Sequence, residues 1–205
     1  NWALVDLIEK QKVEFKYECP DGTTGFPGKV RANVSYSLEN NKLNIEYSAI
    51  TESPTHINIT NHAYFNLNKN ESIGKSFLRI NADKYLELDK SLVPSGKKLL
   101  VKNTSLDFRY SKKLGKIRLD DYFVVNQTNS PVAEFFEPKN GINMSVLTNQ
   151  PGLVVFTPPH FQAICFETQK FSNTPNILSF PSTLINPHEV YCHKTSFVFN
   201  VQKNN

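Results

Sequence analysis

Strict alternation of apolar and polar side chains is the clearest pattern in the sequence. From Val30 to Leu38 every second residue is apolar and the residues between are polar, and a similar alternation returns from Leu43 to Ala49. Alternation with a period of two is typical of a strand with one buried face. Because only the polar residues Glu39–Lys42 separate the two segments, the pattern predicts a long antiparallel hairpin.

The same pattern predicts further strands downstream. Leu78, Ile80 and Ala82 alternate, and Tyr85–Leu88 follows closely. A second hairpin is predicted where two apolar segments flank the turn sequence EPKNG. The two segments of that hairpin are Val132–Phe136 and Ile142–Thr148. Three further strands are predicted at Gly152–Thr157, Gln162–Thr168 and Ser196–Val201.

The first fifteen residues are ambiguous. Leu4, Leu7 and Ile8 have helical spacing, but the segment is short and has no capping signal, so the pattern alone does not decide its structure. Elsewhere the 12 prolines exclude long helices. The predicted fold class is therefore all-β, a single antiparallel β-sandwich or barrel-like domain.

Composition limits the expected core size, partners and cellular location of the protein. A chain of 205 residues with 39% hydrophobic residues is large enough for one sizeable core. The net charge of +4 comes from scattered Lys and Arg, so nucleic acid is not an expected partner. No apolar run approaches the roughly 18 residues that a membrane span needs. An odd number of cysteines, 3, and the absence of a signal-peptide pattern favour a cytoplasmic protein.

His62, in the segment ITNHAYFNL (residues 59–67), is the first candidate for chemistry. A single histidine in a strand-rich chain is more often a packed, hydrogen-bonded residue than a proton donor. Asn58, Thr60 and Asn61 precede it, and such a polar cluster either lines a wet pocket or organises a hydrogen-bond network. Histidine also titrates near neutral pH, which suits proton transfer.

Two carboxylate segments are further candidates. Glu167 ends an apolar strand and is either a solvated carboxylate at the rim or a base whose pKa burial raises, with even weight on the two readings. Asp120 and Asp121 begin another strand, where a turn cap or a hydrogen-bond acceptor for a polyol is more plausible than a metal site. Asp107 and Arg109 suit a surface ion pair.

The remaining motif search is negative. The chain has no nucleophile elbow, phosphate-cradling glycine loop or Cys–His nucleophile pattern. One His, one Glu and one Asp among aromatic and amide side chains suit acid/base chemistry on a polar, uncharged ligand, and sugars fit that description.

In seven segments the sequence resembles the aldose 1-epimerases, also called galactose mutarotases. The segments follow the order of the family's motifs: CPDGTTGFPG (19–28), NITNHAYFNL (58–67), LVPSGKKLLVKNTSLDFR (92–109), LDDYFVV (119–125), TNQPGLVVFT (148–157), ICFETQ (164–169) and FPSTLINPHEVY (180–191). The resemblance covers almost the whole chain.

The resemblance implies a galactose mutarotase-like β-supersandwich, predominantly antiparallel, that interconverts the α and β anomers of hexoses such as galactose and glucose. It implies that Glu167 is the catalytic base and His62 the catalytic acid. Asp120, Asn61 and Tyr64 are the implied substrate-binding residues. No metal or other cofactor is implied. The expected partner is a small aldohexose, and we expect a monomer or weak dimer.

The chain also departs from the family pattern. His56 replaces Pro, Phe156 replaces Tyr, and His188 replaces the Gly of a Pro-Gly-Glu segment. The family's N-terminal stretch, with an arginine and a Leu-His-Gly-Gly segment, has no match. We therefore expect residues 1–205 to form a single aldose 1-epimerase domain that is N-terminally incomplete. The alternatives are a non-catalytic sugar-binding relative and an inactive truncated fragment of the same fold.

Overall fold

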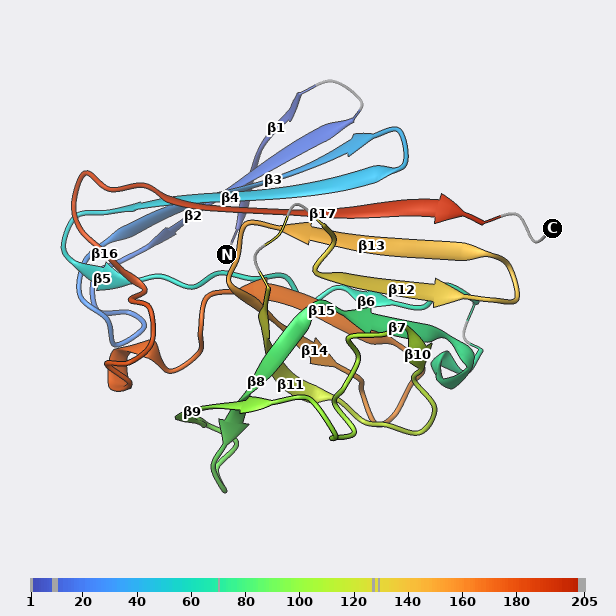
Figure 1. Ribbon diagram of the computed structural model, residues 1–205. Helices are drawn as coiled ribbons and strands as arrows, with labels where there is room; N and C mark the ends of the chain where they lie inside the picture. Colours follow the sequence, from blue (N-terminus) through green and yellow to red (C-terminus); the bar gives the residue numbers. More distant parts are fainter. Residues whose placement is uncertain (1, 9–10, 70, 127, 129, 203–205) are drawn as a thin grey trace.

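Two large antiparallel sheets make up most of the molecule, as the computed structural model in Figure 1 shows. The structure describes residues 2–8, 11–69, 71–126, 128 and 130–202. Every strand pairing among these residues is antiparallel. The all-β, predominantly antiparallel architecture predicted from the alternating pattern is confirmed.

The larger sheet has nine strands and the smaller has six. In spatial order the nine-stranded sheet contains β1 (Ala3–Ile8), β2 (Lys12–Cys19), β3 (Val30–Glu39), β4 (Lys42–Thr51), β17 (Tyr191–Val201), β13 (Ile142–Thr148), β12 (Ala133–Glu137), β7 (Phe77–Ile80) and β10 (Lys112–Lys113). The six-stranded sheet contains β6 (Tyr64–Phe65), β15 (Ile164–Gln169), β14 (Gly152–Phe156), β11 (Asp120–Val125), β8 (Ala82–Leu88) and β9 (Pro94–Leu100).

Four short elements complete the described secondary structure. β16 (Leu184–Ile185) pairs with β5 (Thr55–His56) in a two-stranded sheet. The helical turns Ile73–Lys75 and Thr174–Asn176 are each a single 3₁₀ turn. Within the described residues, no helix is long and apolar enough to cross a membrane.

Both predicted hairpins are confirmed. β3 and β4 pair from Val30↔Thr51 to Glu39↔Lys42, and Asn40 at the turn has a φ of 54°. A residue at positive φ is common in tight hairpin turns, and asparagine tolerates it better than most. β12 and β13 pair around the second predicted turn, where Gly141 has a φ of 74°.

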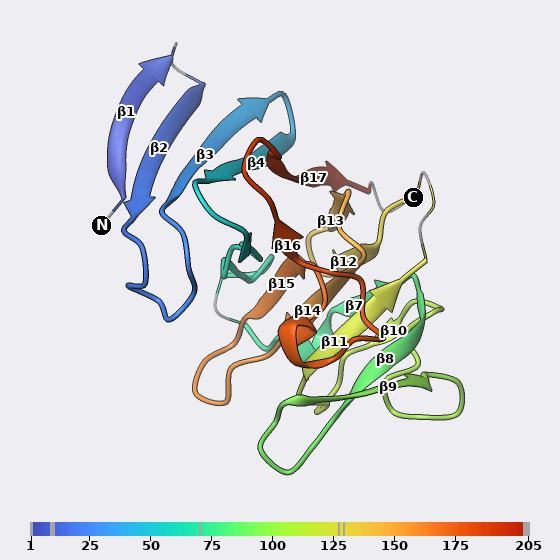
Figure 2. The same cartoon turned by 90° about the vertical axis from the view of Figure 1, so that its left-hand side faces the viewer.

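The ambiguous opening segment forms strands rather than a helix. β1 pairs with β2, and β2 pairs with β3 over eight residues from Lys12↔Ser37 to Cys19↔Val30. Residues 9 and 10, between the two strands, lie outside the described residues. Figure 2 shows β1, β2 and β3 curling away from the other strands of their sheet. Pairing of β1 with β2, which is itself paired with β3, therefore outweighs the local helical spacing.

The main core lies between the two large sheets. Its most deeply buried members come from both: Leu78, Phe135, Met144 and Phe197 from the larger sheet and Phe123, Leu153, Val155 and Phe166 from the smaller, all with 0% of their surface exposed. Because each strand alternates, residues next to these in sequence point away from this core. The outer face of the six-stranded sheet is consequently free to carry polar groups.

Among the departures from the family pattern, His188 is the one on which the backbone conformation bears most directly. It is exposed, and its φ of 72° lies in the left-handed region. That region costs a residue with a Cβ about 1–2 kcal/mol. Glycine avoids this cost, although it loses about 0.5–1 kcal/mol through its greater freedom in the unfolded chain.

We therefore expect His188→Gly to stabilise the protein by about 0.5–1 kcal/mol, measured as the free energy of unfolding in urea. His160→Gly is the matched control, because His160 is also exposed but is not at positive φ. The control should be neutral or destabilising. Equal destabilisation in both variants would contradict the prediction.

Candidate active site

Side-chain hydrogen bonds attach the segment before His62 to the edge of β15. The Asn58 amide donates to the Lys170 carbonyl (3.1 Å) and accepts from the Lys170 amide (2.9 Å). The Thr60 hydroxyl donates to the Thr168 carbonyl (2.9 Å). These polar residues therefore act as a network that places the segment, one of the two roles predicted for them from sequence.

The central strand β17 holds the same segment from the other side. The Tyr191 hydroxyl lies 3.2 Å from the Ile59 amide and 3.3 Å from the Ile59 carbonyl. Nδ1 of His193 lies 3.0 Å from that carbonyl. Because a carbonyl only accepts, the His193 Nδ1 carries a proton and donates it. The backbone three residues before His62 is thus fixed by two buried side chains of β17.

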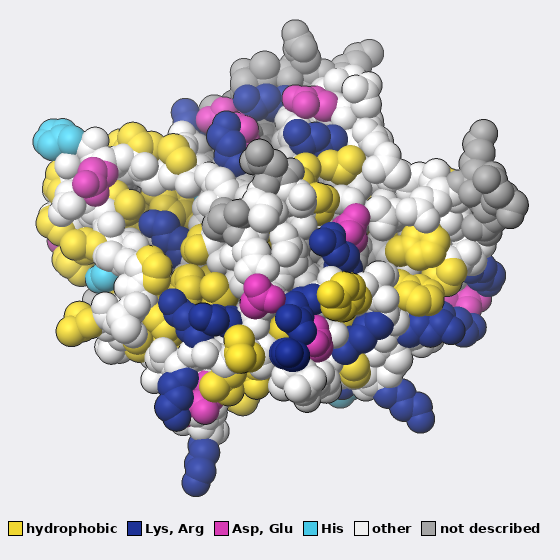
Figure 3. Space-filling view, in the orientation of Figure 1, with side chains coloured by type: hydrophobic (Ala, Val, Ile, Leu, Met, Phe, Trp, Pro, Cys, Tyr) yellow, Lys and Arg dark blue, Asp and Glu magenta, His cyan; other side chains and the backbone are white. Residues whose placement is uncertain are grey.

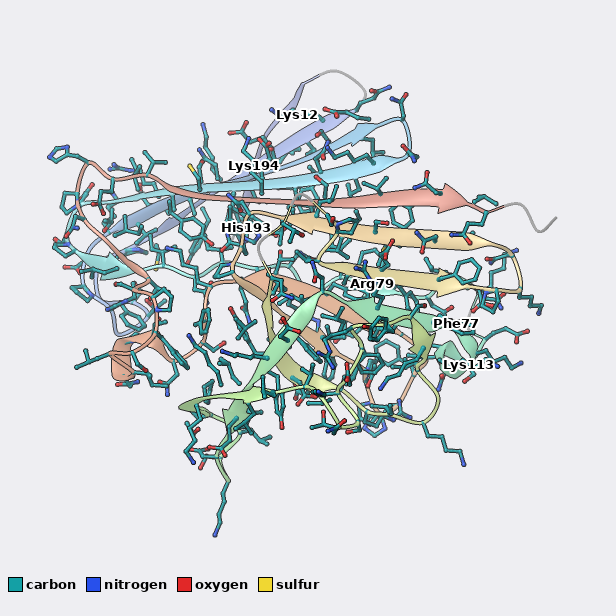
Figure 4. All side chains as sticks on the ribbon, viewed as in Figure 1. Lys12, Phe77, Arg79, Lys113, His193 and Lys194 are labelled. Atoms are coloured by element: carbon teal, nitrogen blue, oxygen red, sulfur yellow. The ribbon has the colours of Figure 1, made fainter. Side chains whose placement is uncertain are left out.

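His193 also belongs to a buried polar cluster between the sheets. Its Nε2 lies 3.0 Å from the Thr168 hydroxyl of β15 and 2.9 Å from the Thr195 hydroxyl of β17. Figure 4 shows His193 on the side of β17 that faces the six-stranded sheet, with Lys194 on the opposite side. Burial lowers the pKa of His193 to about 4, so the imidazole is neutral at neutral pH.

Register places the candidate residues in two adjacent rows on the outer face of the six-stranded sheet. Directly paired residues of neighbouring strands share a face. The first row, across β6, β15, β14 and β11, is Tyr64, Cys165, Phe156 and Asp120. The second row, across β15, β14 and β11, is Glu167, Val154 and Tyr122. Two carboxylates from distant parts of the chain are thereby brought to one surface.

His62 and Glu167 are in direct contact. Nε2 of His62 lies 3.2 Å from Oε1 of Glu167, with 49% of the histidine side chain exposed and 13% of the glutamate side chain. The imidazole packs against the rings of Tyr64 and Phe156, with centroids 5.0 Å and 5.6 Å away. The pair therefore has one partner open to solvent and one largely enclosed.

The electrostatics of Glu167 favour its acting as a proton acceptor. Burial is the main cause that raises its pKa above the ordinary value of 4.5, and the negative charge of Asp120 adds to the rise. His62 opposes the rise. A carboxylate made more basic by desolvation is a better proton acceptor near neutral pH. The raised pKa agrees with the second of the two readings left open for Glu167 from sequence, and its role as a base stays a prediction.

The pair lies in a pocket of about 340 Å³. Asp120, His62 and Glu167 are among its lining residues. Its other walls are largely apolar or aromatic and comprise Leu88, Leu92, Pro94, Tyr122, Val154, Phe156 and Ser172. A volume of this size, with a few convergent polar groups among apolar walls, suits a small polar molecule.

Tyr122 forms part of the pocket wall because Gly152 leaves room for it. A Cβ at position 152 would collide with the Tyr122 ring. The Tyr122 hydroxyl donates to the Gln169 carbonyl (3.1 Å), which ties β11 to the end of β15. The ring is therefore held flat against the sheet behind the pocket.

The structure brings together in one pocket three of the five site residues expected from sequence. The other two, Tyr64 and Asn61, are not among the residues that line it. His62, Glu167 and Asp120 line the pocket. Tyr64 is at the rim, and its ring packs at a tilt between those of His62 and Phe161. Asn61 is buried and points elsewhere: its side-chain oxygen accepts from the Ala63 amide, and its amide group lies beside the Tyr47 hydroxyl.

Sequence reasoning missed several residues that shape the site. The most direct is Cys165, whose Sγ lies 3.4 Å from Nδ1 of His62. The two-residue period of β15 could have indicated it, because Cys165 must share a face with Glu167. Leu88, Leu92 and Pro94 reach the pocket from the β8–β9 hairpin, and no local pattern indicates that approach.

A larger hollow lies elsewhere among the described residues. A hollow of about 610 Å³ lies over β2, β3 and β4, and Lys16, Arg31, Asn33 and Ser48 are among the residues that line it. Its main charged groups, Arg31 and Glu18, are paired with each other at 3.1 Å. It has no adjacent acid and base free to act on a ligand, so we place the candidate active site in the smaller pocket.

Other kinds of site find little support in the described residues. They contain no group of three or more His, Cys, Asp or Glu side chains that could hold a metal ion. On the face in Figure 3, Lys and Arg are interspersed with Asp, Glu and apolar side chains. That face presents no concentrated positive patch.

The fold and the pocket define a class of antiparallel β-sheet proteins with a small pocket lined by polar and apolar groups, and comparison with known proteins identifies the family. The family model described as aldose 1-epimerase matches residues 1–198. The chain belongs to the aldose 1-epimerase family.

Named relatives agree with this assignment. The chain is 32% identical to the galactose mutarotases of Sus scrofa and Homo sapiens, over 92% of its own length. It is 33% identical to the aldose 1-epimerase of Haemophilus influenzae over 86% of its length. The chain spans 63% of the length of the two mammalian proteins and 60% of the bacterial one.

Solved structures share the fold. An aldose epimerase homologue from C. elegans superposes with a TM-score of 0.91 at 27% identity, covering 98% of this chain and 69% of the other. A galactose 1-epimerase from Lactobacillus acidophilus gives a TM-score of 0.83 at 25% identity, covering 98% and 67%. The galactose mutarotase-like fold expected from the sequence motifs is confirmed.

The buried His193 predicts a pH dependence of stability. Its folded pKa of about 4 lies below the ordinary 6.5, so between these values the unfolded state binds the proton and the folded state does not. The free energy of unfolding should fall as pH drops from 6.5 towards 4, by roughly 3 kcal/mol from this residue. Urea unfolding across this pH range measures the slope.

His193→Gln isolates the contribution of this one group, because carboxylates titrate in the same range. The variant should have a shallower pH slope between 4 and 6.5, whatever its stability at neutral pH. Parallel slopes for the two proteins would show that His193 takes up its proton equally in both states.

Proposed function

We propose that this chain carries the acid/base centre of an aldose 1-epimerase and interconverts the α and β anomers of aldohexoses such as galactose and glucose. The observation that carries the proposal is the 3.2 Å contact between His62 and Glu167 within a pocket that also contains Asp120. Membership of the family and the names of its relatives support it.

The proposed reaction needs two coordinated proton transfers. The anomeric hydroxyl on C1 loses its proton to Glu167, and the ring oxygen gains a proton from Nε2 of protonated His62. The bond between C1 and the ring oxygen breaks, which gives the open-chain aldehyde. Rotation about C1–C2 and closure with the roles reversed then yield the other anomer.

The environment of each group suits its proposed role. Desolvation makes Glu167 more basic, and His62 beside it is exposed enough to meet a bound sugar. Asp120, an acceptor-only carboxylate on the same face of the sheet, would bind sugar hydroxyls. The aromatic ring of Phe156 offers a surface for the C–H groups of the sugar.

A second candidate is sugar binding without catalysis. It is favoured by one observation: Asp120 and the ring of Phe156 line the pocket and could bind a sugar without any proton transfer by the His62–Glu167 pair. The first experiment below distinguishes catalysis from sugar binding alone.

Polarimetry of freshly dissolved α-D-galactose tests the proposed reaction. The chain should accelerate mutarotation over buffer, and His62→Ala and Glu167→Gln should each lower the rate by about 10²–10⁴-fold. Glu134→Gln is the matched control, because Glu134 pairs with Arg79 in the other sheet (2.8 Å) and should leave the rate unchanged. Galactose binding without acceleration would support the non-catalytic candidate instead.

The pH profile of the same reaction tests the role of Glu167. Because its pKa is raised above 4.5, the rate should fall as the pH drops through a midpoint above that value, where the base becomes protonated. Mutarotation rates between pH 4 and 8 measure the midpoint. A midpoint at or below 4.5 would indicate that a solvated carboxylate, not Glu167, is the base.

A further inference from the structure

Both ring nitrogens of His62 meet side chains of the same strand. Nε2 lies 3.2 Å from Oε1 of Glu167, and Nδ1 lies 3.4 Å from Sγ of Cys165. Within the part of the chain that the structure describes, no other polar atom lies at hydrogen-bonding distance from Nδ1. β15 therefore holds the imidazole at both of its polar positions.

The geometry follows from the period of the strand. Cys165 and Glu167 are two residues apart, so they share a face and their Cα atoms are roughly 6.6 Å apart along β15. Both side chains can therefore reach the same imidazole, one at each ring nitrogen. Tyr64, which pairs with Cys165 across β6 and β15, fixes the distance of the His62 backbone from the strand.

The thiol has the right properties to serve both protonation states of His62. Cys165 is fully buried, and its burial together with the charge of Glu167 raises the pKa of the thiol to about 12. It therefore stays an S–H group near neutral pH. An S–H group is a weak donor and its sulfur a weak acceptor.

We propose that Cys165 is a positioning residue that holds Nδ1 of His62, so that Nε2 is the nitrogen that faces Glu167 and the substrate. The proposal rests on the proposed function, because Nε2 is the atom from which the ring oxygen of the sugar receives its proton.

The sulfur can remain in contact throughout the reaction. When His62 is protonated, Nδ1–H donates to Sγ and Nε2–H is available for transfer. After Nε2 has given up its proton, Nδ1–H still donates to Sγ, and the unprotonated Nε2 can take the proton back on ring closure. When the imidazole is neutral with its proton on Nε2, the S–H group donates to Nδ1.

The other groups around His62 do not duplicate this contact. Tyr64 and Phe156 present their rings, and Glu167 contacts Nε2 rather than Nδ1. Asp120 and Tyr122, the titratable groups of β11 that line the pocket, lie two strands away from Cys165 in the sheet. Removal of the sulfur would leave Nδ1 without a partner and the ring free to turn about its Cβ–Cγ bond.

Three substitutions at position 165 separate the polar contact from packing. Cys165→Ala removes the sulfur and leaves a small cavity, whereas Cys165→Val fills the space without a donor or an acceptor. Cys165→Ser keeps both functions in a smaller side chain. Cys192→Ala is the control, because Cys192 is exposed. Thermal unfolding of each variant confirms that it is folded before any comparison.

The first measurement is steady-state mutarotation of galactose. The Ala and Val variants should lose roughly 10- to 100-fold in kcat with KM within about twofold, because misplacement of a proton donor affects the chemical step and not substrate binding. The Ser variant should recover most of the loss, and Cys192→Ala should match the wild type. An unchanged kcat in both the Ala and Val variants would overturn the proposal.

The second measurement does not depend on activity. ¹⁵N-resolved NMR of the imidazole, assigned with His62→Gln, reports which ring nitrogen carries the proton and whether the ring reorients. The wild type and the Ser variant should each show one ordered ring, and the Ala and Val variants should show exchange-broadened or averaged nitrogen signals. Identical signals in all variants would overturn the proposal, even if the wild type proved inactive and the proposed function had failed.

Discussion

One face of the six-stranded sheet must be apolar and the other must carry polar groups. The alternation of side chains along its strands satisfies both requirements. One face presents Phe123, Leu153 and Phe166 to the core with no exposed surface. The other presents the carboxylates Asp120 and Glu167 to the pocket. A slip of one residue in register would drive the carboxylates into the core and the aromatic rings into water, so burial on one face fixes the chemistry on the other.

His62 is placed by a different means, because its segment is too irregular for a backbone ladder. Asn58 and Thr60 replace the ladder with side-chain hydrogen bonds to β15, and Tyr191 and His193 bind the Ile59 backbone from β17. Buried polar groups are costly unless they are paired. The same bonds that place the histidine therefore also penalise alternative positions of the segment.

The sequence predicted features that depend on local period and missed those that depend on distant contacts. The hairpin of β3 and β4 was predictable because its alternation is long and regular. The first strands were not, because Leu4, Leu7 and Ile8 also fit a helix and only the pairing of β1 with β2 decides between the two. Local polar and carboxylate patterns made His62, Glu167 and Asp120 candidates, and motif resemblance assigned their expected roles. Their gathering depends on register across strands far apart in sequence. Asn61 shows the limit: a polar residue beside a pocket can equally well point into the interior.

The position of β17 has a consequence for how the protein forms during synthesis. This strand comes last among the described strands, yet it lies between β4 and β13 in the middle of the larger sheet. Figure 1 shows it crossing the whole width of the molecule. Until residues 191–201 leave the ribosome, β4 and β13 each have an unpaired edge that can bind another chain. The larger sheet therefore stays divided until β17 is made, and the anchors of the His62 segment arrive after all the other described strands.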